Sequence, residues 1–377
     1  DEEVLGNPFK DFDENAETIK DLRRQAYNDT NYAIAGDFHR WNKRNTQLLA
    51  FRGDWTSQVN PNHQLKAGSE IEFKDISRLN VIDWGSTNIY VDAYGDQSQF
   101  FDDSKFKDVL EPLRPKTAAV YVQDKMEFNQ MIVNAGFRFD LFDPAGQSPA
   151  DELDPLELNP DGTVKIDERT QLPIVKNPKD ASVKSQISPR LGISYPVTER
   201  NKLHFTYGHY FQIPRAQDLY ENLHYDMRGA IRRMGNPDLK PEKTISYEVG
   251  IEHQFTDSLV GDITGFSKDI DNLVDSKHVT PSTSAANDYS YFINGIFGHV
   301  QGVELTLRKQ QTEKSRMYGA LSYTYSVAEG KGSSRSLGYL TYYRSQPKVT
   351  ESWPLDWDQR HVVSALVGIQ FPYGFRL

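Results

Sequence analysis

The chain has 377 residues, a formal net charge of −10 and no cysteine, so disulfide cross-links are excluded. The acidic balance argues against a nucleic-acid partner, and the absence of any run of about 18 apolar residues excludes a transmembrane helix. A mean hydropathy of −0.65 still allows strands that alternate apolar and polar residues. With 20 Tyr, 20 Phe and 5 Trp, the composition fits either a membrane barrel with aromatic girdles or a tyrosine-rich β-sandwich.

The first segment, residues 1–43, does not alternate, and we expect an external loop region there with a short helix over residues 16–27. The chain does not open with a charged-then-apolar leader, and we expect both of its ends to be cuts within a longer protein. After this segment, an alternating pattern begins and continues almost to the end of the chain.

Period-two alternation, which marks a strand with one apolar face, is clearest over residues 244–255. Glu248 and Glu252 fall on the polar face, which we expect to be concave. The apolar face, expected to face lipid, holds Ile245, Tyr247, Val249, Ile251 and Phe255. The same pattern predicts eleven strands, over residues 44–59, 63–77, 117–126, 128–142, 184–197, 201–212, 243–255, 259–271, 291–308, 316–328 and 357–371.

The connections between these strands are alternately short and long. In an up-and-down meander every second connection lies on the same rim, so all short turns share one rim and all long loops the other. A Greek-key sandwich gives no reason for this rhythm. The predicted fold class is therefore all-β, an antiparallel up-and-down transmembrane β-barrel segment with its strand meander over residues 44–371. Its long external loops are expected over residues 78–116, 143–183, 213–242, 272–290 and 329–356.

Five short motifs occur in order along these strands. They are residues 188–195 (SPRLGISY), 205–214 (FTYGHYFQIP), 235–243 (GNPDLKPEK) with 247–250 (YEVG), 302–305 (GVEL) and 356–361 (DWDQRH). Together they resemble the barrel of TonB-dependent outer-membrane receptors, over residues 117–371. The resemblance implies a barrel of about 22 strands around a plug domain. About half of those strands are visible in the sequence, and neither a plug nor a TonB-contacting motif is. We therefore expect an open curved sheet.

The resemblance also implies a function and its partners. The function is TonB-driven uptake of a scarce, bulky nutrient across the bacterial outer membrane, the nutrient being a ferric siderophore, cobalamin, a glycan or a peptide. The implied partners are outer-membrane lipid and lipopolysaccharide, the TonB complex through the plug domain, and the small nutrient ligand. Two alternatives stay open. A passive porin or structural barrel would lack the plug, and a soluble β-rich binding protein would stay in solution without detergent.

We interpret the family motifs as structural. Pro237 and Pro241 lack backbone donors and bar regular strand pairing, so the run around them forms a rigid lead from loop to barrel wall. The motif residues read in this way are Asn236, Pro237, Leu239, Lys240, Pro241, Glu242, Arg360 and His361.

Loop 213–242 gathers arginines and aromatic residues, whose guanidinium forks and ring faces suit an anionic or aromatic ligand. The candidate ligand-binding residues are Arg215, Tyr220, His224, Tyr225, Arg228, Arg232 and Arg233. The alternative, which we favour on the sequence alone, is a loop that faces lipopolysaccharide or pairs its charges internally.

No phosphate-binding loop, metalloprotease histidine pair or nucleophile elbow is present, so we predict no enzyme activity, no cofactor and no metal. One partial match is a calcium loop, because Glu157, Asn159, Asp161 and Glu168 have EF-hand spacing with Gly162 at the sixth position. Pro160 and the lack of flanking helices favour a β-turn instead. We therefore expect the four oxygen-bearing side chains not to converge.

Overall fold

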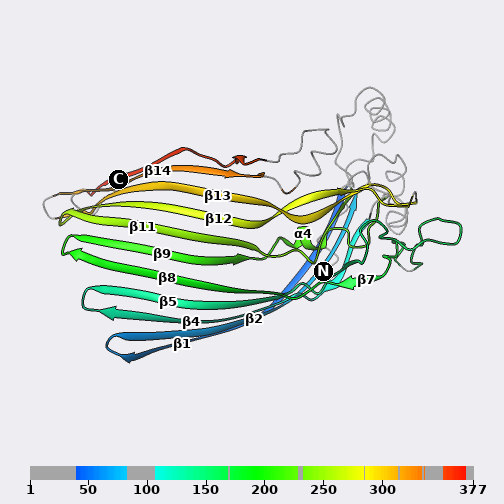
Figure 1. Ribbon diagram of the computed structural model, residues 1–377, viewed down its shortest axis with the longest axis horizontal. Coiled ribbons are helices and arrows are strands. Elements are labelled where there is room, and N and C mark those ends of the chain that lie inside the picture. Colours follow the sequence, from blue (N-terminus) through cyan, green and yellow to red (C-terminus); the bar gives the residue numbers. More distant parts are fainter. Residues whose placement is uncertain are drawn as a thin grey trace, which may run out of the picture.

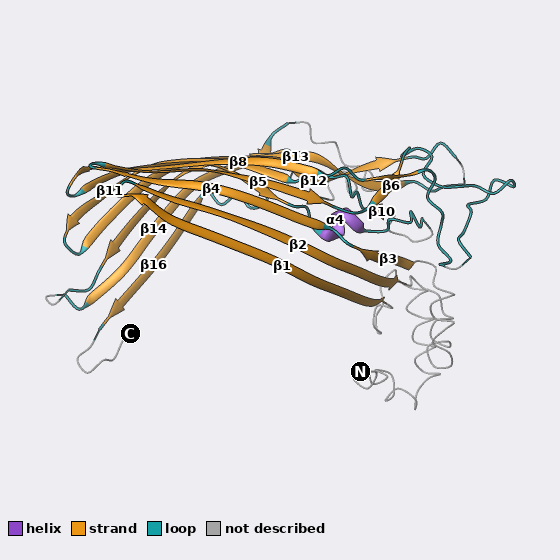
Figure 2. Ribbon diagram, turned by 90° about the horizontal axis from the view of Figure 1, so that it is seen from below, coloured by secondary structure: helices purple, strands orange, loops and turns teal. Residues whose placement is uncertain are grey.

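The computed structural model describes residues 40–82, 107–168, 170–227, 232–283, 285–312, 315–332, 335 and 351–370. Most of them belong to one sheet, antiparallel except for one short pairing, that curves into an open arch (Figures 1 and 2). Its long strands are Arg40–Asn60 (β1), His63–Ile82 (β2), Lys116–Phe128 (β4), Met131–Asp143 (β5), Lys184–Thr198 (β8), Asn201–Gln212 (β9), Glu242–Thr256 (β11), Leu259–Val279 (β12), Tyr289–Lys309 (β13), Met317–Gly330 (β14) and His361–Ile369 (β16).

Each long strand pairs antiparallel with the next long strand in the chain, as the alternating connections predicted. The predicted meander and the predicted open sheet are both confirmed, and no pairing joins β1 to β16 in the described part of the chain. Short elements decorate this path: Lys107–Leu113 (β3), Gln147–Pro149 (β6), Pro178–Asp180 (β7), Arg233–Met234 (β10), Trp353–Pro354 (β15) and the helix Ala216–Tyr220 (α4). The single parallel pairing recorded among the described residues joins β10 to β13. No helix in the described residues is long and apolar enough to cross a membrane.

Several predicted boundaries need correction. The expected loop 272–290 is much shorter, because β12 runs on to Val279 and pairs with β13 from Tyr289 onward. An irregularity between Ile270 and Leu273, with Asn272 at a φ of 63°, lets the hairpin continue past a turn-like sequence. The expected loop 78–116 begins later, because β2 reaches Ile82, and it contains β3. The predicted helix over residues 16–27 lies outside the described residues.

The last long strand begins at His361 and not at residue 357. Residues 357 and 358 belong to a turn in which the Asp358 amide donates to the carbonyl of Leu355 at 2.8 Å. The Asp358 carboxylate then accepts the amide of Ala328 at 2.9 Å. This side-chain bond to β14 replaces the ladder bond that a longer strand would have made.

The two faces of the sheet differ as the alternation predicted. The helix α4 lies under the arch (Figure 2), and its Leu219 and Tyr220 pack with Phe142, which shares a face of β5 with Arg138. The polar face is therefore concave. Register carries this face across the sheet to β11 through Arg138 opposite Ser188, Arg190 opposite Gly208, and Gly208 opposite Ser246.

The convex face is apolar and open to the surroundings. On β11, Val249 is 60% exposed on this face, while Glu248 between its apolar neighbours is half-buried on the other. The prediction that Glu248 and Glu252 face the concave side is confirmed. Aromatic pairs lie on the convex face, with the rings of Tyr207 and Tyr247 5.1 Å apart. A convex apolar surface with aromatic residues is what a lipid-facing barrel wall presents.

Candidate functional site

The short turns all lie at one end of the arch and the longer connections at the other (Figure 1). Two segments dominate the second end. We call residues 213–241 the cap and residues 144–183 the arm. The cap lies against the concave side of the strand ends, and the arm projects beyond them (Figures 1 and 2). This is the end where the sequence placed the candidate ligand-binding residues.

The arm is a folded β-structure although its sequence is rich in proline and aspartate. Strands β6 and β7 pair at its base, and isolated bridges join Leu156 to Val175 and Ile166 to Pro173 further out. The extended β12–β13 hairpin holds it in place. The hydroxyl of Tyr289 donates to the carbonyl of Glu152 at 2.6 Å, and the amide of Ser282 donates to the carbonyl of Leu153 at 2.7 Å.

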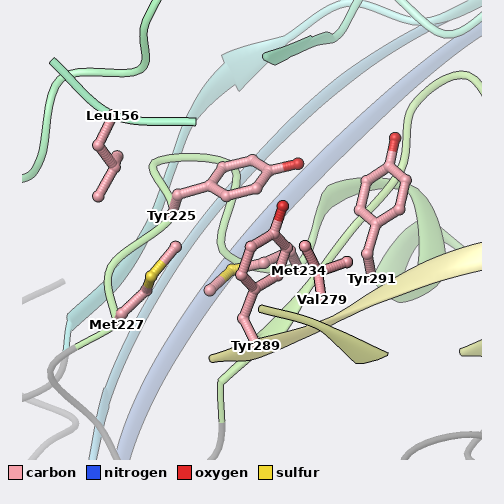
Figure 3. Packing of buried hydrophobic residues seen from close by; sticks show 7 residues of the cluster. All are labelled: Leu156, Tyr225, Met227, Met234, Val279, Tyr289 and Tyr291. Atoms are coloured by element: carbon pink, nitrogen blue, oxygen red, sulfur yellow. The ribbon is translucent and has the colours of Figure 1, made fainter. Parts of the chain in front are cut away.

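Two hydrophobic clusters fill the junction between cap, arm and strand ends. The first contains Phe142, Leu219, Tyr220, Leu239, Val274 and Phe292. The second, shown in Figure 3, contains Leu156, Tyr225, Met227, Met234, Val279, Tyr289 and Tyr291. Both draw on strands and loops far apart in sequence, so they tie the cap and arm to the wall.

Two candidate ligand-binding residues are part of these clusters. Tyr220 is 2% exposed, and its hydroxyl donates to the carbonyl of Pro144 at 2.9 Å. Tyr225 is fully buried, with its ring edge-on to Tyr289 at a centroid distance of 5.5 Å (Figure 3). Burial raises the pKa of both phenols, so both stay neutral. Both rings are thus occupied by packing in this conformation.

The arginines of the set have different surroundings. Arg233 makes a two-pronged ion pair with Glu221, at 2.8 and 3.0 Å, and lies 5.6 Å from the ring centroid of Phe292. Arg232 donates to the carbonyl of Met227 at 3.0 Å. Arg215 is exposed at the start of α4. His224 is half-buried, and Arg228 lies outside the described residues. A ligand-binding role for this set stays a prediction.

An ion pair joins α4 to Arg335. The side chain of Asp218 is 3% exposed and accepts a hydrogen bond from Arg335 at 2.7 Å. Burial raises the pKa of Asp218, and the charge of Arg335 opposes that rise. The residue Arg335 therefore contacts the cap and helps to fix its position.

The motif residues after the cap helix all lie in structural contacts. Asn236 donates to the carbonyl of Phe292 at 2.8 Å and accepts the amide of Asp238 at 2.9 Å. Leu239 is 1% exposed in the first cluster. The backbone of Lys240 makes two hydrogen bonds with the side chain of Asn294, at 2.8 and 2.9 Å.

The remaining motif residues also contact neighbouring strands. The carbonyl of Pro241 accepts the side-chain amide of Asn272 at 3.3 Å, and Glu242 opens β11. A methyl group on Gly146 would clash with the ring of Pro237, so arm and cap backbones approach closely there. Further along the chain, Arg360 pairs with Asp358 at 2.7 Å, and His361 stacks on Tyr323. These contacts support the structural interpretation of the motif.

The calcium-like loop lies on the arm, and three of its four candidate side chains have other partners. Glu157 pairs with Lys165 at 2.9 Å, and Asn159 donates to the hydroxyl of Thr163 at 3.0 Å. Asp161 accepts the amide and hydroxyl of Thr163, which lowers the pKa of Asp161. These bonds build the tip of a β-turn. No group of three or more His, Asp or Glu suited to a metal ion occurs among the described residues.

The concave wall pairs many of its charges, some across strands and some along one strand. Lys202 of β9 contacts Glu252 of β11 at 2.7 Å, and Arg138 contacts Asp140 at 2.8 Å. Aromatic rings lie beside some of these pairs. The ring of Tyr121 covers Gly68, and the ring of Tyr210 covers Gly208, so that a methyl group at either glycine would meet the ring. The result is a polar wall lined in part by flat rings.

Two hollows open on this wall, of about 380 and 460 Å³. Alternation along single strands did not reveal them, because each hollow is lined by five or more separate segments. The sequence does hold a signal for such hollows, because glycines on the polar face of neighbouring strands leave space there. The geometry offers a polar concave wall with two hollows below a packed cap, which suits contact with a polar solute.

Comparison with known proteins agrees with this architecture. The family model described as "TonB dependent receptor-like, beta-barrel" matches residues 5–375. A vitamin B12 transporter, BtuB of Photobacterium profundum, is 29% identical over 174 residues, which are 44% of this chain and 25% of that protein. The matched part therefore spans only a quarter of the relative's length.

Solved structures share the fold at low sequence identity. The FrpB iron transporter of Neisseria meningitidis superposes with a TM-score of 0.52 at 13% identity, over 88% of this chain and 41% of that one. The hemophore receptor HasR of Serratia marcescens, solved with its hemophore HasA and heme, gives 0.51 at 16% identity, over 88% and 50%. At such identities the likeness supports the fold alone.

Proposed function

We propose, from the premise that this chain belongs to the family of TonB dependent receptor-like β-barrels, that it forms the wall and cap through which an outer-membrane receptor takes up a scarce nutrient. Members of this family are outer-membrane β-barrel proteins, and they are receptors and not enzymes. The chain's location is accordingly the bacterial outer membrane. Energy for uptake would come from TonB, and the contact with TonB would be made by a part of the receptor other than this wall.

One observation carries the proposal: the sheet is apolar on its convex face and charged on its concave face, with a packed cap over one end. A lipid-facing exterior and a wet interior are the two surfaces of a transport barrel. The cap and arm occupy the rim with the long connections, which in such barrels is the external rim. A solute arriving from outside would therefore meet the cap before it meets the concave wall.

Vitamin B12 is the first ligand to test. The reason is the BtuB relative, which is named as a vitamin B12 transporter and shares 29% identity over 174 residues. A polar wall suits the other classes of bulky polar solute equally well, namely ferric siderophores, glycans and peptides. A panel of these ligands should therefore be run beside vitamin B12.

The test uses the complete receptor gene that contains this chain, expressed in an outer-membrane host with and without TonB. Accumulation of radiolabelled vitamin B12 and of labelled ferric siderophores, glycans and peptides is then measured. We expect accumulation of one ligand that depends on both the receptor and TonB. Equal accumulation without TonB would favour the passive porin, and no accumulation of any ligand in the panel would overturn the uptake proposal.

A further inference from the structure

One of the two hollows on the concave wall has an unusual charge pattern. It measures about 380 Å³ and lies between the middles of β4, β5, β8 and β9. Every charged side chain that lines it is positive: Arg52, Lys66, Arg138 and Arg190. Uncharged donors lie among them, including the side chains of Gln123, Asn134 and Thr206. The lining therefore offers hydrogen-bond donors and positive charge, and no carboxylate.

Two of these four cations are already compensated from outside the hollow. Arg52 contacts Asp54 at 3.0 Å. Arg138 contacts Asp140 at 2.8 Å and Glu70 at 3.8 Å. These carboxylates reduce the field that the two arginines exert on the hollow.

Arg190 differs from them. No carboxylate pairs with it in the part of the chain that the structure describes, although nearby cations of the same wall, such as Lys202 with Glu252, are paired. Its recorded contact is with the ring of Tyr210, whose centroid lies 5.0 Å from the guanidinium carbon. Its partners in register on both neighbouring strands are glycines, Gly136 and Gly208. The guanidinium thus stands exposed in the hollow, with no side chain at the position opposite it on β5.

We propose that Arg190 is the centre of a binding subsite for an oxyanion, a phosphate or carboxylate group carried by the solute that passes along this wall. The guanidinium fork matches the two oxygens of such a group. The ring of Tyr210 gives a flat apolar surface for the part of the solute that bears the anion. Arg138 on the adjacent β5 and Lys66 on β2 line the same hollow and add positive charge to it.

The size of the hollow agrees with this assignment. Small-molecule sites in proteins usually enclose about 300–1,000 Å³, and a hollow of about 380 Å³ accommodates an oxyanion with the ring attached to it. The subsite deepens the proposed function, and rests on it, by naming the ligand class as anionic. It also lies below the cap, so a solute would reach it only after passing the rim.

Calorimetric titration of the complete, detergent-solubilised receptor tests the subsite. The probes are phenyl phosphate, benzoate, inorganic phosphate and neutral benzyl alcohol. We expect the two aromatic anions to bind more tightly than inorganic phosphate, benzyl alcohol not to bind, and affinity to fall as salt screens the charges. Arg190→Gln should weaken phenyl phosphate binding by about tenfold, and Arg190→Lys should give an intermediate loss because the charge stays but the fork is lost.

Lys202→Gln is the matched control, because it removes a cation from the same face that already has a carboxylate partner. It should leave phenyl phosphate affinity unchanged. Unchanged heat-modifiable gel mobility shows that each variant remains folded. Equal affinities of wild type and Arg190→Gln, or no binding of either anion by the wild type, would overturn the subsite. Binding is measured without TonB, so a failed uptake assay with intact anion binding would count against the proposed function alone.

Discussion

On β11 the side chain of Val249 is 60% exposed, whereas Phe292, near the cap end of β13, is fully enclosed. Both are apolar residues on strands of one sheet. The wall presents its apolar side chains outward, where lipid can cover them, and its polar side chains inward. The cap region does the reverse and encloses its apolar residues in two clusters.

This comparison separates two sources of stability within one sheet. In the wall, apolar burial comes from the surrounding membrane, and the strand ladder satisfies the backbone. In the cap, burial comes from the chain itself, as in a water-soluble domain. A change that opens a cavity should therefore act on the cap, and a change that places charge in lipid should act on the wall.

The largest expected effect is in the cap. Phe292→Ala removes a buried ring that supports Leu239 and Arg233, and should destabilise the cap by about 3–5 kcal/mol. Limited proteolysis of the complete receptor should then cut within residues 213–241, while heat-modifiable mobility of the wall persists. Val249→Ala, on the convex face, is the control and should leave the cap resistant. Loss of both cap and wall in Phe292→Ala would show that the two regions are one cooperative unit.

A smaller effect is expected from a charge on the wall. Val303 and Glu304 are neighbours on β13 but face opposite sides, Val303 on the convex face at 40% exposure. Val303→Arg should cost about 2–4 kcal/mol near the membrane midplane. Glu304→Arg, on the polar side, should cost much less. Urea unfolding of the complete receptor in lipid vesicles measures both, and equal losses would contradict the assignment of the two faces.

The smallest expected effect concerns pH at the junction of cap and wall. Burial raises the pKa of Asp238, but hydrogen bonds from Lys184 and Ser182 outweigh it, and the net shift is downward. The carboxylate therefore stabilises the fold above its unfolded pKa of about 3.9, and this contribution is lost as pH falls through the lower folded pKa.

Asp238→Asn should remove that dependence. Because Asp238 is half exposed, the change should be well below about 1 kcal/mol at neutral pH. Proteolysis of the cap between neutral and acidic pH measures it, with Ser182→Ala as a variant that removes one donor and leaves the carboxylate charge. If wild type and Asp238→Asn lost cap protection over the same acidic range, Asp238 would have no part in the pH response.

The wall was predictable from sequence because its rule is local. Each strand repeats apolar and polar residues with a period of two, so the faces of β11 and the meander could be predicted from single segments. The cap was not predictable in the same way. Tyr220 and Tyr225 look like ligand-binding residues in a polar loop, yet Tyr220 bonds to a carbonyl 76 positions earlier in the chain.

The predicted strand and loop boundaries were also wrong where tertiary contacts override the local sequence pattern. The alternation placed the end of a strand at residue 271, but pairing with β13 carries β12 on to Val279. The arm reads as a loop because of its prolines, and it is shaped by bridges between residues as far apart as Leu156 and Val175. In each case the deciding partner lies on another segment of the chain, so the pattern within one segment does not contain the information.

The close contacts between rings and glycines have a consequence for how this wall can evolve. Gly68 makes room for the ring of Tyr121, whose hydroxyl reaches Asp54 two strands away, and a methyl group on Gly68 would meet both ring and carboxylate. A mutation at one of these positions thus changes which residues the other two positions tolerate. Among related proteins with this wall, Gly68, Tyr121 and Asp54 should therefore be kept or replaced together. A larger residue at position 68 would become tolerable only after the ring at position 121 had been lost.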